Sequence, residues 1–179
     1  MRKLNAILTA LIMVLFLLHA VFGATELVGA GYNGLKIAAR ACFVLIVIHT
    51  LIGIKLTVDT LCVSRKTGVS YFRENRLFWA RRISGLAVMI LLCFHMFAFG
   101  KTTNGVFQLK PFTTVKLIAQ ILLVLSIALH VLTNIRPALI SFGARGLKQH
   151  AGSILIVLSF VLLVFITAFI IYYLRWQAF

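Results

Sequence analysis

Residues 82–100 read RISGLAVMILLCFHMFAFG, an almost continuous apolar segment that carries one histidine, His95. A helix of this length rises about 28 Å, close to the roughly 30 Å hydrocarbon core of a bilayer. Apolar residues do not alternate with polar ones along it, as they would in a strand of a membrane β-barrel. The segment therefore predicts a membrane-spanning helix with an ionisable side chain inside the membrane.

Four further segments have the same character, at residues 4–23, 37–60, 113–135 and 152–174. The chain is 62% hydrophobic and 12% charged, whereas about a quarter of the residues in a soluble domain are charged. Pro111 precedes the fourth span and Pro137 follows it, at positions where helices usually begin and end. We expect an all-α, polytopic membrane protein of five transmembrane helices, a single domain over residues 1–179 with no room for a soluble catalytic domain.

The first segment has a second interpretation. Because it follows Arg2 and Lys3 and ends near Gly23 and Ala24, it also resembles a secretory signal peptide. Its length and the presence of His19 favour a retained membrane helix.

The net charge of +15 is unusual for a chain with so few charged residues. Nucleic acid is not the expected partner, because the basic residues lie between apolar segments and do not form a soluble face. In a membrane protein such charge more often sets orientation and contacts lipid head groups or an acidic partner.

Lysine and arginine are unequally divided between the two sides of the predicted membrane. The richer side holds Arg2, Lys3, Arg65, Lys66, Arg73, Arg76, Arg81, Arg82, Arg136, Arg145 and Lys148. The poorer side holds Lys36, Arg40, Lys101, Lys110, Lys116 and Arg175. The positive-inside rule then predicts a multi-pass protein of the cell membrane with a cytoplasmic N-terminus and an external C-terminus.

Each of the first four spans contains one histidine, and these are His19, His49, His95 and His130. The fifth histidine, His150, precedes the last span. Ionisable side chains inside apolar spans are costly and usually serve a function. A single one can be a packing residue, but one in each of four helices points to a shared role. Neutral imidazole is a good iron ligand, so the pattern predicts a four-helix bundle that binds haem through pairs of histidines, with a fifth helix beside it.

The depth of each histidine in its span predicts the pairs. At about 1.5 Å per residue, His95 lies roughly 20 Å into its span, and His19 is similarly deep towards the outer face. His130 lies roughly 9 Å from the inner edge and His49 about 15 Å from it. We therefore expect His19 and His95 to ligate an outer haem and His49 and His130 to ligate an inner one.

Several other residues fit this scheme less specifically. Gly53, one turn from His49, has no side chain and can admit a porphyrin edge, although helix packing explains it equally well. Lys55, Arg81, Arg82 and Arg136 can pair with the propionates of the inner haem, or simply anchor the spans at the membrane surface.

The segment YFRENRLFWARRISG at residues 71–85, followed by His95, is similar to the aromatic-rich loop and Arg-x-Ser/Thr-Gly helix start of a known family. His49-Thr50-Leu51-Ile52-Gly53 also resembles the second helix of that family, and the order of the spans agrees. The chain resembles the diheme cytochrome b membrane anchor of succinate:quinone oxidoreductases, which are the succinate dehydrogenases and fumarate reductases of respiratory complex II. The resemblance covers nearly the whole chain, but only the segment leading into the third span is specific.

The resemblance implies two b haems, a proximal one held by His49 and His130 and a distal one held by His19 and His95, with Ser84 among the cofactor-binding residues. It implies an iron–sulfur subunit and an FAD flavoprotein docked on the cytoplasmic side, over residues 65–82. Electrons would pass between these subunits and a membrane quinone, commonly menaquinone, and the anchor by itself would not act on the dicarboxylate. Whole complexes can associate further, in a number that the resemblance leaves open.

Two positions bear on proton transfer, and only the first is known from that family. Some diheme members have a glutamate two residues before the fourth-span ligand, and here that position is Ala128. Glu26, in the predicted loop after the first span, can exchange protons with a quinol or be an ordinary loop residue.

Two other functions stay open. The chain can be the diheme cytochrome b anchor of another quinone-linked oxidoreductase, such as a hydrogenase or formate dehydrogenase. It can also be a haem-free transporter or assembly factor whose histidines handle protons or metal. Co-purifying subunits distinguish the first, and an absorption spectrum distinguishes the second.

Overall fold

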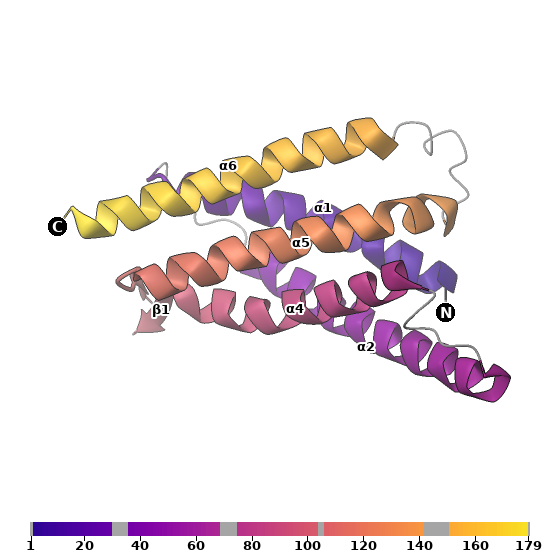
Figure 1. Ribbon diagram of the computed structural model, residues 1–179. Coiled ribbons are helices and arrows are strands. Elements are labelled where there is room, and N and C mark those ends of the chain that lie inside the picture. The colour runs from indigo at the N-terminus through magenta and orange to yellow at the C-terminus, as the bar shows by residue number, and fades with distance from the viewer. Residues whose placement is uncertain (1, 30–35, 69–74, 104–105, 142–150, 179) are drawn as a thin grey trace.

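The computed structural model describes residues 2–29, 36–68, 75–103, 106–141 and 151–178. Within these ranges the chain folds into five long helices that run alternately up and down the bundle (Figure 1). Each is long and apolar enough to cross a membrane. The prediction of an all-α, multi-pass membrane protein with five spans is therefore confirmed.

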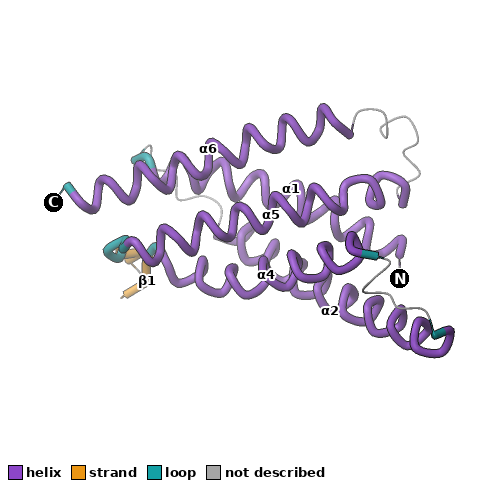
Figure 2. Tube along the Cα trace, viewed as in Figure 1, coloured by secondary structure: helices purple, strands orange, loops and turns teal. Residues whose placement is uncertain are grey.

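The helices are α1 Arg2–Leu27, α2 Lys36–Thr67, α4 Arg76–Ala98, α5 Thr114–Ser141 and α6 Ala151–Gln177. A short antiparallel hairpin joins α4 to α5, and its strands are β1 Gly100–Thr103 and β2 Val106–Leu109. Figure 2 shows this hairpin at one end of an otherwise helical chain. The N-terminus and the C-terminus lie at opposite ends of the bundle (Figure 1). We call the end with the N-terminus the N-side and the other end the C-side.

Each of the five helices packs against at least two of the others. α4 and α5 make the most extensive contact, α1 packs on α2, and α6 packs against both α5 and α1. The main buried cluster joins Val124 of α5 to Leu162 and Phe165 of α6, with Phe16 of α1 beside it. The outer surface is strongly apolar, because large side chains such as Phe160 and Ile156 are 68% and 73% exposed. Such a surface suits lipid as the surrounding medium.

The third span begins earlier than its apolar segment suggests. α4 starts at Arg76, and the side chain of Asn75 caps it by accepting a hydrogen bond from the Phe78 amide at 3.0 Å. Asparagine is favoured at this position because it satisfies an amide that has no partner in the first turn. Arg76 and Arg81 therefore lie in the helix, before residue 82, where the third span was expected to begin. Arg65 and Lys66, which precede that span, belong to the last turn of α2.

The fourth span ends later than expected, because Pro137 lies inside α5. Proline has no amide proton, so the carbonyl of Thr133, four residues earlier, loses its helical partner. Arg81 of α4 replaces that partner by donating from Nε to the Thr133 carbonyl at 2.9 Å. The helix can thus continue past proline, and the same bond ties α4 to α5.

Candidate functional site

The four span histidines meet in two pairs. His19 of α1 faces His95 of α4 towards the C-side, with ring centres 6.0 Å apart and ring planes at 85°. His49 of α2 faces His130 of α5 towards the N-side, with ring centres 6.3 Å apart and ring planes at 87°. These are the two pairs that depth along the spans predicted.

The two pairs lie at different levels of the bundle. Ser84 of α4 contacts His130, and His95 lies eleven residues further along the same helix. At the rise of an α-helix this separation is roughly 16 Å. The pairs therefore form two distinct sites, one above the other along the bundle axis.

In the C-side pair, His95 is held by Gln120 of α5. The His95 Nδ1 atom lies 2.7 Å from the Gln120 Oε1 atom, and Gln120 is only 1% exposed. Because an amide oxygen can only accept, Nδ1 carries the proton and Nε2 keeps its lone pair. Phe99 packs on the same imidazole at 5.3 Å between ring centres, so the ring is fixed from two directions.

In the N-side pair, Ser84 holds the His130 ring by a hydrogen bond to its Nδ1 atom. Its hydroxyl donates to the Arg81 carbonyl at 3.2 Å, which uses its only proton. The 3.2 Å contact between Ser84 Oγ and His130 Nδ1 must then be a bond donated by Nδ1. His130 Nε2 is therefore the atom that keeps a lone pair, as for His95.

Gly85 provides the space that the His130 ring occupies. A Cβ atom at position 85 would lie 2.9 Å from His130 Cε1, closer than real Cβ contacts come. The other ring of the pair, that of His49, lacks such a hydrogen bond. Its Nδ1 atom is buried without a hydrogen-bond partner among the described residues.

The spacing within each pair is compatible with a metal ion held between the two imidazole rings. A metal–imidazole nitrogen bond is about 2 Å, and each nitrogen lies about 1 Å from its ring centre, so two imidazoles that share one ion have ring centres about 6 Å apart. Both observed separations match. No group of three or more His, Cys, Asp or Glu side chains gathers in the described part of the chain. Two axial nitrogens are what haem iron takes from protein when the porphyrin supplies the other four.

Some of the predicted neighbours of the inner site are close to it. A Cβ atom built on Gly53 of α2 would lie 3.8 Å from Nη1 of Arg82, so the guanidinium reaches across from α4 to α2. Arg82 also lies over the ring of Phe78, at 5.1 Å from its centre. Arg81 reaches α5 through the Thr133 carbonyl. Gly53, Arg81, Arg82 and Ser84 thus gather at the N-side end of the bundle.

Two other predicted residues are not brought into the sites. Lys55 is 57% exposed and pairs with Asp59 at 3.6 Å. Arg136 is exposed in the last turns of α5. Glu26 is exposed in the last turn of α1, so the expectation that it lies in the following loop is wrong, but it is close enough to His19 for their charges to interact. His150 lies outside the described residues.

Sequence reasoning missed Gln120 as a partner of His95. Its signal was present, because a lone glutamine within an apolar span is as costly as a histidine and calls for a partner. Gly85 lay inside the segment that carried the family resemblance, but its contact with His130 needed the α4–α5 packing.

Comparison of the chain with protein-family models, with curated proteins and with solved structures finds no match.

Proposed function

We propose that this chain is the diheme cytochrome b membrane anchor of a succinate:quinone oxidoreductase. It would link a soluble iron–sulfur protein and its FAD-containing partner to a membrane quinone. One observation carries the proposal: two cross-helix imidazole pairs, 6.0 and 6.3 Å apart, at two levels of a membrane-spanning bundle. Haem, once bound, supplies one-electron redox chemistry at each level.

The residues of the chain would hold and orient the cofactors. His19 and His95 would be the ligands on the C-side, and His49 and His130 those on the N-side. Gln120 and Ser84 keep the Nδ1 atoms of His95 and His130 occupied, which leaves Nε2 of each ring to bind iron and would make it a better donor. On the N-side, Arg82 and Arg81 would supply cationic groups for the haem propionates.

The N-side is the expected docking surface for the iron–sulfur subunit. Arg65 and Lys66 at the end of α2 and Arg76 at the start of α4 are all exposed there. Clustered cations favour an acidic partner surface and speed its association. By the positive-inside rule this side faces the cytoplasm, where the soluble subunits would also be.

The proposal is tested by purifying the chain in detergent after expression with haem supply, and by measuring haem per chain and the reduced b-type spectrum. We expect two haems. His95→Ala should remove one and His130→Ala the other, with separable spectral losses. His150→Ala is the matched control, because this histidine is outside the four spans that carry the pairs, and it should retain both haems. A chain that folds but binds no haem would end the proposal.

The attachment to complex II is tested separately, by isolating the native complex and identifying its subunits. An iron–sulfur protein and a covalent or tightly bound flavin would support it. A hydrogenase or formate dehydrogenase subunit would overturn it and leave the haem sites intact.

A further inference from the structure

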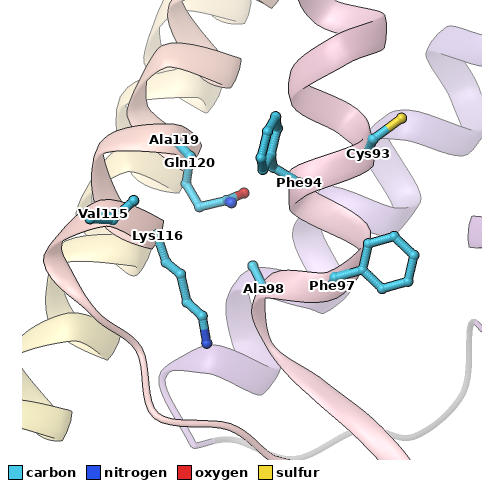
Figure 3. A pocket seen from close by; sticks show the side chains of 8 residues that line it. All are labelled: Cys93, Phe94, Phe97, Ala98, Val115, Lys116, Ala119 and Gln120. Atoms are coloured by element: carbon cyan, nitrogen blue, oxygen red, sulfur yellow. The ribbon is translucent and has the colours of Figure 1, made fainter.

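A cavity of about 360 Å³ lies between α4 and α5, towards the C-side. Phe94, Phe97 and Ala98 line it from α4, and Lys116, Ala119 and Gln120 line it from α5 (Figure 3). Phe94 and Phe97 are 62% and 69% exposed, so this cavity opens to the outside of the bundle, where lipid would be. A ligand of this cavity would therefore come from the membrane.

Gln120 brings a polar group into this apolar space. Figure 3 shows its side chain extending from α5 across the cavity towards Phe94. Gln120 is 1% exposed, and its Oε1 atom accepts a hydrogen bond from His95. Its Nε2 atom is buried and has no hydrogen-bond partner in the part of the chain that the structure describes. Buried amide donors are nearly always paired, so this one points to a ligand that accepts a hydrogen bond.

The C-side rim of the cavity carries two cations. Lys116 lies in the first turn of α5, and Lys110, just before that helix, is close enough for the two charges to interact. The Lys116 ammonium donates to the Pro111 carbonyl at 2.6 Å, which leaves two of its three protons for a ligand. Neither lysine forms a salt bridge within the described residues. Two neighbouring cations without an acidic partner favour an anionic ligand.

The spacing of these groups in depth matches a glycerophospholipid. Gln120 lies four residues further into α5 than Lys116, or about 6 Å deeper at the rise of a helix. The interfacial layer on each side of a bilayer is about 5–8 Å thick, with the lipid phosphates in its outer part and the ester carbonyls at its inner edge. A phosphate beside Lys116 would thus place an ester carbonyl near the level of Gln120. A zwitterionic head group would bring its own cation towards the lysines, so a head group with net negative charge fits better.

We propose that this cavity binds an anionic phospholipid of the phosphatidylglycerol type, with its phosphate between Lys110 and Lys116 and an ester carbonyl accepting a hydrogen bond from Gln120 Nε2. The acyl chains would lie along the exposed rings of Phe94 and Phe97. Such a lipid would contact α4 and α5 together at their C-side ends. Binding would not need haem, so the inference goes beyond the proposed function and does not rest on it.

The test uses the full chain in detergent, freed of co-purified lipid, with dimyristoyl phosphatidylglycerol and dimyristoyl phosphatidylcholine as probes. Native mass spectrometry gives the Kd of each lipid. Phosphatidylglycerol should bind the wild-type chain at least tenfold more tightly, because the two lipids differ only in the head group. Lys110→Gln and Lys116→Gln should each raise its Kd about fivefold and leave the phosphatidylcholine Kd nearly unchanged. Arg40→Gln is the matched control, because Arg40 is an exposed C-side cation of α2 that does not line the cavity, and it should change neither Kd.

Two further variants test the deeper part of the site. Gln120→Met removes the donor at nearly constant volume, and Ala119→Phe fills the cavity without touching the amide. Both should raise the Kd of both lipids at least fivefold, because the esters and acyl chains are common to the two. Ile118→Phe is the matched control, because Ile118 precedes Ala119, is 52% exposed and does not line the cavity. It should leave both Kd values unchanged.

Equal binding of the two lipids to the wild-type chain would overturn the inference. An unchanged phosphatidylglycerol Kd in Lys116→Gln or in Ala119→Phe would do the same. Displacement of the lipid by excess inorganic phosphate would also overturn it, because the rim would then bind a free anion and the cavity no lipid. A chain that lacks haem but binds phosphatidylglycerol in this way would defeat the proposed function alone.

Discussion

Replacing Gly85 by alanine should stabilise the helix α4 but push the His130 ring out of its place. In a helix interior, alanine is favoured over glycine by about 1 kcal/mol, so the substitution alone should stabilise α4. However, the new Cβ atom would lie 2.9 Å from His130 Cε1, about 0.5 Å short of the 3.4 Å at which ordinary contact begins. The His130 ring must therefore move away from α4.

A displacement of that size matters more to a metal bond than to packing. Metal–ligand distances tolerate deviations of about 0.2 Å, so a shift of about 0.5 Å takes His130 out of bonding range of an iron shared with His49. We expect Gly85→Ala to fold, to bind one haem per chain in place of two, and to keep the spectrum of the haem held by His19 and His95. The assay is the haem-to-protein ratio, read with difference spectra during a redox titration.

Gly152→Ala is the control for this experiment. Gly152 also lies in a helix, α6, but nothing lies within 4 Å of a Cβ atom built there. It should retain both haems. If Gly85→Ala also retains two haems with both spectra unchanged, the close approach of His130 to α4 is not a feature of the haem site, and the reasoning fails.

Two further substitutions test the contacts that orient His130 and join α4 to α5. Ser84→Ala removes the acceptor for His130 Nδ1 and should weaken haem binding at that site by about 10- to 100-fold, measured by haem transfer to excess apomyoglobin. The His19–His95 site should be unaffected and Ser84→Thr should restore affinity, whereas an equal loss at both sites would indicate a general folding defect. Arg81→Ala leaves the Thr133 carbonyl without its donor and should lower the stability of the detergent-solubilised chain by about 1–3 kcal/mol in thermal unfolding. In a Pro137→Ala background the amide at position 137 can donate to the Thr133 carbonyl, so Arg81→Ala should lower the stability much less. An equal loss of stability in both backgrounds would refute the role of proline.

The membrane fold was largely predictable, because composition and segment length determine it. Continuous apolar segments of membrane length allow only helices when they do not alternate. Helix ends were harder to predict, since they depend on single polar contacts. The Asn75 cap extends α4 before its apolar segment, and the Arg81–Thr133 bond lets α5 continue past Pro137.

The histidine pairs were predictable from depth, because a helix converts residue number into height. The residues around them were less predictable, since rotation about each helix axis decides which side chains meet. Lys55 has the depth expected of an inner-site residue but points to Asp59 and the surface. Gln120 meets His95 only because α4 and α5 pack closely with that rotation. Haem ligation itself stays a prediction.

The central claim is most directly tested by electron paramagnetic resonance of the oxidised, purified chain, with the spins counted against protein. The account predicts two low-spin ferric irons per chain. Their signals should be strongly anisotropic, because nearly perpendicular imidazole planes, at 85° and 87°, leave the iron orbitals almost degenerate. High-spin ferric iron, or no iron signal from a folded chain, would contradict it.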